Sequence, residues 1–310
     1  MNLAVPVDDG VTLAVRHRPG SVWPPFLLVH ALESNARLWD QVAGHLSEAG
    51  HAVYAVDLRG HGASDAPEHG YDNATAAADL AAVAAAVGLT GAVVAGHSWG
   101  GHLAIRLAAE HPGLVAGLAL LEGGWAGPAA IYGSWEVFDA VIRSMLSLTD
   151  GGGATVDRMR DYLRIIHPGW SAEAIDASLS SMRVNPDGTL APALTEPQRT
   201  AIMRSLWDDA PARWFPGVSV PVLLMPAFPK DNPQWPPSIR ALVDQIRACV
   251  YQAASDLPQA TIREYLDSDH DLHAQHPRRV AEDLLRLARN IQNPPASRYV
   301  PRDRGAGTGS

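Results

Sequence analysis

The chain of 310 residues contains a single cysteine, Cys249. One thiol excludes an intramolecular disulfide framework and a multi-cysteine zinc site, so we expect a protein of a reducing compartment, the cytoplasm. No stretch reaches the roughly 18 consecutive apolar residues that a membrane-spanning helix needs. The first ten residues, MNLAVPVDDG, also lack the cationic start of an export signal. We therefore expect neither export nor membrane anchoring.

Runs of Lys and Arg are also missing, and the net charge is −9. This balance gives no electrostatic reason to expect a nucleic acid or an anionic membrane as partner. With 47% hydrophobic and 18% charged residues, the chain is able to bury a large core. A small neutral or apolar ligand suits it better, and the oligomeric state stays open.

What the chain does contain is an alternation of short apolar runs with helical patterns, which is typical of βαβ units and a mostly parallel sheet. The runs are nearly continuous in hydrophobicity, as expected when helices cover both faces of the sheet. We predict an α/β fold with an eight-stranded sheet that begins with an antiparallel hairpin. The predicted strands are 3–7, 11–15, 25–30, 52–57, 92–96, 117–122, 220–225 and 261–265, and the clearest helices are 73–87, 99–110 and 279–291.

This alternation is interrupted between residues 123 and 215, where Met, Trp and Tyr are scattered through amphipathic segments. We interpret 123–215 as a helical cap inserted into a core domain made of 1–122 and 216–292. The tail 293–310 is rich in Pro, Gly, Arg and Ser and is expected to be disordered.

The strongest chemical signal is Gly96-His97-Ser98-Trp99-Gly100, which lies between a predicted strand and a predicted helix. A serine on so sharp a turn adopts strained backbone angles, and glycines two positions to either side let strand and helix approach closely. This context is typical of a nucleophile elbow, with Ser98 as the nucleophile.

The elbow in this context resembles that of the α/β-hydrolase superfamily, and the resemblance extends over roughly residues 3–290. The segment 27–32 (LLVHAL) is similar to the strand that supplies the oxyanion hole in that family. The resemblance implies that the backbone amides of Leu32 and Trp99 form this hole, although Ala31 stands where the family usually has glycine. Two such amides stabilise the developing oxyanion by about 3 kcal/mol per donor.

The segment 57–65 (DLRGHGASD) is similar to another family stretch, and the resemblance implies a structural role in which Asp57 and Arg59 tie a tight loop beside the elbow.

The family places its catalytic base seven residues before a proline that opens the last helix. Counting back from Pro277 selects His270 as the general base. His273 and His276 follow on one helical face, where packing or capping is the expected role. The three histidines with Asp269 and Asp271 also form a weak metal pattern, and we expect no metal and no cofactor.

Two carboxylates compete for the role of the acid that orients His270. Asp231 follows the strand 220–225, the commoner location in the family. Glu122 ends the strand 117–122, and its spacing of 122 − 98 = 24 residues from Ser98 is similar to that in haloalkane dehalogenases and zearalenone lactonases. We favour Glu122, with Asp231 as the alternative.

The predicted cap contains five of the nine tryptophans of the chain, which suggests an aromatic-lined pocket. Since most tryptophans at helical spacing pack a small domain, we expect only one or two of the five to reach a ligand. The residues named for substrate binding are Trp125, Trp135 and Trp207.

The sequence as a whole predicts a serine hydrolase that cleaves a carboxylic ester or a lactone of a small apolar or aromatic compound. Serine at position 98 disfavours epoxide hydrolases and haloalkane dehalogenases, which use a carboxylate nucleophile. The alternatives are carbon–carbon bond or amide hydrolysis on the same triad, and a slow ligand-binding receptor of the same fold.

Overall fold

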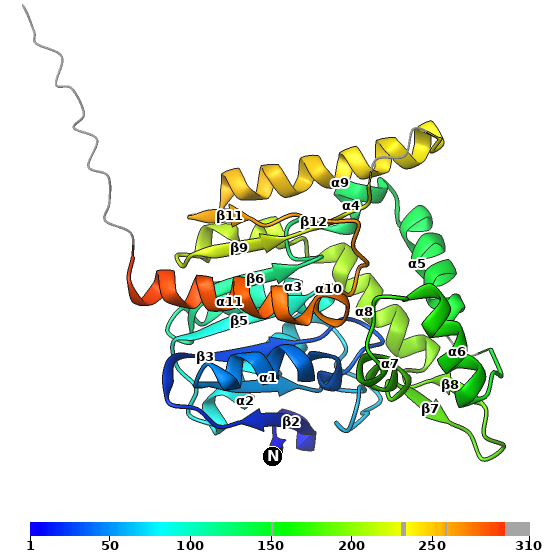
Figure 1. Cartoon of the computed structure of the whole chain (residues 1–310), viewed down its shortest axis with the longest axis horizontal. Helices are drawn as coiled ribbons and strands as arrows, with labels where there is room; N and C mark the ends of the chain where they lie inside the picture. Colours follow the sequence, from blue (N-terminus) through cyan, green and yellow to red (C-terminus); the bar gives the residue numbers. More distant parts are fainter. Residues whose placement is uncertain (150–151, 231–233, 258, 295–310) are drawn as a thin grey trace, which may run out of the picture.

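An eight-stranded sheet in the order β1-β2-β4-β3-β5-β6-β9-β11 runs through the molecule (Figure 1). The computed structural model describes residues 1–149, 152–230, 234–257 and 259–294. Strands β1 and β2 pair in antiparallel fashion, β2 pairs antiparallel with β4, and the pairs from β4 onward are parallel. The predicted mostly parallel α/β sheet is confirmed. Its strands are β1 (Asn2–Pro6), β2 (Thr12–Arg18), β3 (Val22–Val29), β4 (His51–Val56), β5 (Ala92–His97), β6 (Val115–Leu121), β9 (Val222–Met225) and β11 (Ala260–Ile262).

Helices cover both faces of this sheet, which explains why the central strands are nearly continuous in hydrophobicity. On one face α1 (Asp40–Glu48) and α11 (Pro277–Gln292) pack against side chains such as Leu28, Ala95 and Leu121. The other face is covered by α2 (Asn73–Ala86), α3 (Trp99–Glu110) and α9 (Pro237–Asp256). Burying apolar strands on both sides contributes about 25 cal/mol per Å² of apolar area removed from water.

A long segment separates β6 from β9. It forms α4 (Pro128–Tyr132), α5 (Trp135–Thr149), α6 (Val156–Ile166), α7 (Ala172–Leu179), the hairpin β7 (Met182–Val184) with β8 (Leu190–Pro192), and α8 (Glu196–Asp208). Figure 1 shows α5, α6, α7 and the hairpin gathered at the right-hand side of the sheet, in green. The interpretation of this segment as a cap domain stays a prediction. Of the tail 293–310 that was predicted to be disordered, residues 295–310 lie outside the described residues.

Two differences from the predicted elements have a physical cause. The predicted strand 261–265 is two short strands, β11 and β12 (Tyr265–Leu266), and β12 pairs with β10 (Ala227–Phe228) in a sheet of its own. The long helix α9 has no clear sequence signal because Val250 and Ala253 are its buried residues, so most of its surface is solvated.

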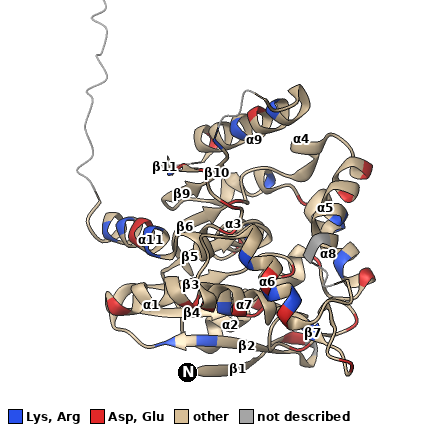
Figure 2. Ribbon diagram, turned by 45° about the vertical axis from the view of Figure 1, so that its right-hand side comes forward, with Lys and Arg blue, Asp and Glu red and all other residues tan. Residues whose placement is uncertain are grey.

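Charged side chains of both signs are interspersed on exposed helices such as α6 and α11 (Figure 2). No helix in the described part of the chain has the length and apolar character required to cross a bilayer.

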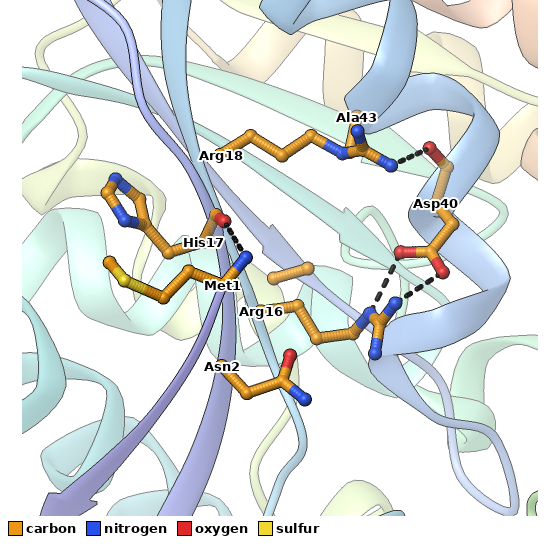
Figure 3. Close-up of a pocket in the computed structure, with 8 residues that line it drawn as sticks. Met1, Asn2, Arg16, His17, Arg18, Asp40 and Ala43 are labelled. Carbon is orange, nitrogen blue, oxygen red and sulfur yellow. Dashed lines mark hydrogen bonds and ion pairs between the residues drawn. The ribbon is translucent and has the colours of Figure 1, made fainter.

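A small hollow of about 160 Å³ lies where the first strands meet α1 (Figure 3). Arg16 contacts both carboxylate oxygens of Asp40, at 2.8 Å and 2.6 Å, and Arg18 donates to the carbonyl of Asp40 at 3.3 Å. The N-terminal ammonium donates to the carbonyl of His17 at 2.9 Å. These contacts fasten the first strands to α1, and no serine lines this hollow among the described residues.

Candidate active site

Ser98 lies at the sharp turn between β5 and α3, with φ 51° and ψ −112°. This positive φ is the strained conformation that the elbow motif predicts. The amide of Ser98 donates to the carbonyl of Leu121 at 2.8 Å, which fixes the turn against the neighbouring strand β6. The serine side chain therefore stands at a defined position at the end of the sheet.

The glycines around Ser98 are required by close backbone contacts. A Cβ on Gly96 would lie 2.2 Å from the carbonyl oxygen of Gly100. A Cβ on Gly100 would lie 2.5 Å and 2.7 Å from the carbonyl oxygens of Val29 and His30. These approaches are shorter than real Cβ contacts, so a side chain at either position would force the backbone of the elbow to shift.

His270 and Glu122 meet beside this turn. Nδ1 of His270 lies 3.2 Å from Oε2 of Glu122, although 148 residues separate the two in sequence. Desolvation lowers the pKa of His270, but the hydrogen bond and the charge of Glu122 outweigh it and hold the pKa above the ordinary value of 6.5. The imidazole is 46% exposed, so it remains accessible from the cavity described below.

Glu122 is itself rigidly held, because it directly follows β6. Its Oε1 accepts a hydrogen bond from the amide of Ala227 at 2.6 Å, and its own amide donates to the carbonyl of Met225 at 3.3 Å. Its φ of 49° turns the side chain out of the strand direction. The structure thus brings the favoured acid to His270, while the alternative Asp231 lies outside the described residues.

The loop after β3 places Leu32 in the wall of the same cavity as Ser98. Among the described residues, neither the amide of Leu32 nor that of Trp99 donates to a protein acceptor. Both amides are therefore free to donate to an oxyanion. Ala31 is accommodated in place of glycine because the positive φ of this loop, 58°, falls on Glu33.

Two buried neutral histidines support this loop. Nδ1–H of His30 donates to the carbonyl of Ala31 at 2.7 Å, and its Nε2 accepts from the amide of Leu58 at 3.0 Å. Nδ1–H of His61 donates to the carbonyl of Arg59 at 2.9 Å, and its Nε2 accepts from the amide of Glu33 at 3.3 Å. Desolvation lowers the pKa of His30 to about 4 and that of His61 to about 3.

The stretch around Asp57 makes the structural contacts that its resemblance implies. Its carboxylate accepts from the amides of Ala36 at 2.7 Å and Ala63 at 3.0 Å, which closes the loop. Arg59 forms a fully buried ion pair with Asp79 at 2.6 Å.

The other two histidines of the late loop lie away from the reaction site. His273 is fully buried between Trp39 and His97, with ring centroids 4.3 Å and 4.6 Å away. His276 precedes α11, and its Nε2 lies 3.0 Å from Oγ of Ser268. In the described part of the chain, the group with metal-binding geometry is His97, Asp271 and His273, whose ligand atoms lie within 4.8 Å of one another.

A cavity of about 520 Å³ contains Ser98, His270 and Glu122 in its wall. Its remaining wall is mainly apolar and comes largely from the segment between β6 and β9. No Lys or Arg is found among the described residues that line it. The large apolar side chains are Leu32, Leu38, Trp99, Trp125, Ile131, Phe138, Ile142, Met145, Leu146, Leu163, Trp170, Met182, Met203, Leu206 and Ile246.

Comparison with known proteins agrees with this geometry. The alpha/beta hydrolase fold family matches residues 24–142. A crystal structure of E-2-(acetamidomethylene)succinate hydrolase superposes with a TM-score of 0.72 at 23% identity and covers 93% of this chain and 98% of that one. The chain has the α/β-hydrolase fold, and its residues 24–142 match that family.

Two further relatives of this α/β-hydrolase are hydrolases by name. A 2-(acetamidomethylene)succinate hydrolase from Mesorhizobium japonicum is 29% identical over 221 residues, which are 71% of this chain and 75% of that protein. The structure of the esterase EaEST from Exiguobacterium antarcticum has a TM-score of 0.66 at 20% identity and covers 93% of this chain and all 100% of its own.

The three tryptophans that the sequence predicts to bind substrate do not all line the cavity. Trp125 lines the cavity, whereas Trp135 and Trp207 are not among the described residues that line it. These two rings pack against Phe138, with centroids 5.8 Å and 5.9 Å away, and it is Phe138 that reaches the cavity. Helical spacing alone does not reveal which face of α5 or α8 is turned inward, which explains the difference.

Sequence reasoning missed several polar side chains that line the cavity, among them His102, Tyr132 and His167. His102 lies one helical turn after Ser98 on α3, so its spacing from the nucleophile is a signal that could have found it. Tyr132 and His167 end short helices of the inserted segment and carry no comparable signal.

Proposed function

We propose that this α/β-hydrolase cleaves a neutral carboxylic ester or lactone with an apolar or aromatic body, through an acyl-enzyme on Ser98. His270 takes the proton of Ser98 as Oγ attacks the carbonyl, and the amides of Leu32 and Trp99 stabilise the oxyanion. His270 then protonates the leaving alcohol oxygen. Water attacks the acyl-enzyme with His270 again as base, and Glu122 stabilises the imidazolium in both half-reactions.

The contact between Glu122 and His270 is the observation that carries this proposal. A carboxylate 3.2 Å from Nδ1 selects the tautomer that leaves Nε2 free to accept a proton, and it raises the pKa of the imidazole. A histidine so oriented, on one cavity with a serine at a strained turn, suits nucleophilic catalysis.

The composition of the cavity supports a neutral substrate. The acidic side chains in its wall are Glu33, Glu122 and Asp271, and Lys and Arg are missing from its described lining. An anionic substrate would be desolvated there without a permanent cation to pair with, which is unfavourable. Two of the similar proteins are named for a succinate, a dicarboxylic acid. Their likeness to this chain therefore supports a hydrolytic reaction more than it supports a dicarboxylate substrate.

Amide hydrolysis is the second candidate, because the name of the relative from M. japonicum contains an acetamido group. The same serine and histidine would serve, with protonation of a leaving nitrogen in place of oxygen. We also propose that the segment 123–215 acts as a cap over the substrate, since most of the apolar cavity wall comes from it.

The test combines a fluorophosphonate probe with a substrate panel. We expect the probe to label wild-type protein on Ser98, and p-nitrophenyl esters of apolar acids to be cleaved faster than their anilide counterparts and than p-nitrophenyl hemisuccinate. Preferred cleavage of the anilides or the hemisuccinate would overturn the neutral-ester proposal. Labelling without turnover of any substrate would favour the receptor alternative.

A further inference from the structure

A second histidine–carboxylate pair lies on the wall of the cavity, separate from Glu122 and His270. His167 follows the last residue of α6, and its Nδ1 lies 2.9 Å from Oδ2 of Asp269. Because a carboxylate only accepts hydrogen bonds, Nδ1–H is the donor. In the neutral ring this leaves Nε2 as a hydrogen-bond acceptor.

The ring of His167 is held from two sides. It stacks on Trp170 with centroids 4.1 Å apart and planes 18° apart. Its partner Asp269 is fixed in turn, because the amide of Asp269 donates to Oε1 of Gln275 at 2.7 Å. A rigid acceptor of this kind loses little conformational entropy when a ligand binds.

The free nitrogen of His167 is open to the cavity. His167 is one of the residues that line the cavity. Among the described residues, its Nε2 has no protein hydrogen-bond partner, and it is not one of the buried polar atoms without a partner. Most of the surrounding wall is apolar, so an oriented acceptor there discriminates between ligands more strongly than it would in water.

We propose that His167 is a specificity-determining residue whose Nε2 accepts a hydrogen bond from a substrate hydroxyl. The inference rests on the proposed ester or lactone hydrolysis and narrows its substrate class to hydroxylated compounds, phenolic or alcoholic. The hydroxyl is a substituent on the body of the substrate and not part of the reacting ester group, because the residues proposed to act on that group, Ser98 and His270, are other side chains of the cavity.

Matched substrate pairs test this inference. The p-nitrophenyl esters of the 2-, 3- and 4-hydroxy isomers of 3-phenylpropanoic acid are compared with that of 3-phenylpropanoic acid itself. We expect the wild type to favour at least one hydroxylated isomer by about tenfold in kcat/KM, which corresponds to one net hydrogen bond. In His167→Phe, which keeps the stacking on Trp170, the preference is expected to fall to about one.

Asp269→Asn distinguishes the proposed role from a purely structural contact between α6 and the late loop. A structural contact alone would leave the preference between substrates unchanged. Asparagine offers a donor as well as an acceptor, and with its amide nitrogen facing Nδ1 it donates there, which leaves Nε2 protonated and turns it into a donor. We expect the preference for hydroxyl to weaken and a 4-acetyl substituent, an acceptor, to become favoured over hydrogen. The ratio within each variant cancels any general loss of activity caused by the neighbouring His270.

His45→Phe is the matched control, since His45 also contacts a carboxylate, Glu48, at 3.3 Å but lies on α1 outside the cavity wall. Its substrate ratios should equal those of the wild type. Equal rates for all hydroxylated isomers and the parent ester in the wild type would overturn the inference, as would an equal loss on both substrates in His167→Phe. If wild-type protein cleaves no ester at all, the proposed function itself fails.

Discussion

Ser98 and Glu122 have nearly the same unusual backbone conformation, with φ of 51° and 49°. Such angles cost of order 1–3 kcal/mol for a residue with a Cβ and persist only where the surroundings enforce them. The glycines around Ser98 made its turn predictable from sequence. Nothing around Glu122 indicated a positive φ, so its selection over Asp231 depended on the spacing from Ser98.

Ser98→Ala is expected to abolish hydrolysis, with kcat/KM falling at least about a thousandfold, because Ser98 is the serine that stands at the strained turn on one cavity with His270 and Glu122. Alanine meets the same positive φ as serine, so the fold should be retained. Steady-state kinetics with a circular dichroism spectrum checks this. Near-wild-type activity with an unchanged spectrum would remove Ser98 from the mechanism.

Glu122→Gln is expected to lower kcat by roughly three to four powers of ten, since glutamine does not stabilise the imidazolium of His270. Glutamine still offers an oxygen to the amide of Ala227, which preserves the strand contact. Asp231→Asn is the control and should cost about tenfold or less. The opposite order of the two mutants would make Asp231 the acid.

The pH profile follows from the same contact. The base must be neutral, so kcat/KM should rise with pH through the pKa of His270, which Glu122 holds above its ordinary value of 6.5. Removing the charge leaves desolvation, which lowers this pKa. The acidic limb of kcat/KM against pH is therefore expected to move to lower pH in Glu122→Gln. An unmoved limb would show that the carboxylate does not act on His270.

At the scale of elements, continuous apolar strands were predictable, whereas weakly patterned helices were not. The helix α1 contains Gly44 and spans nine residues, which leaves too short a pattern to recognise from the sequence alone. The packing of Trp135 behind Phe138 could not be predicted either, because it depends on how α5 is rotated against α8.

The contact of α3 with β3 gives a prediction about stability. In Gly100→Ala the new methyl group would clash with the backbone oxygens of Val29 and His30, so we expect a loss of at least about 2 kcal/mol in the free energy of unfolding. Gly44→Ala is the control, because no atom lies within 4 Å of its Cβ and α1 should gain roughly 0.5–1 kcal/mol. Thermal denaturation of both variants compares them, and equal melting temperatures would contradict the packing argument.

At the scale of the whole molecule, the cavity joins residues from both ends of the chain to the segment between β6 and β9. The fold and the strained turn at Ser98 could be predicted from motifs because each motif is local. The wall of the cavity could not, since its composition depends on how α4 to α8 pack on the sheet.

Activity is expected to persist in EDTA, because the proposed steps need only Ser98, His270 and Glu122. The assay is hydrolysis of a p-nitrophenyl ester before and after chelation. Loss in chelator with recovery on adding zinc would instead give a role to His97, Asp271 and His273, whose geometry suits a metal ion.

The unit formed by β5, α3 and β6 carries both Ser98 and Glu122 within 122 − 98 = 24 positions. If the following segment, up to β9, were exchanged for that of a related gene, the recipient would therefore keep its nucleophile and its acid together. The glycines around Ser98 would be kept with them. The late loop with His270 lies beyond the exchanged part and would also be inherited unchanged. We therefore expect substrate range and bond-breaking chemistry to be separately heritable in this chain, so that a chimera acquires the donor's preferences while keeping the recipient's reaction.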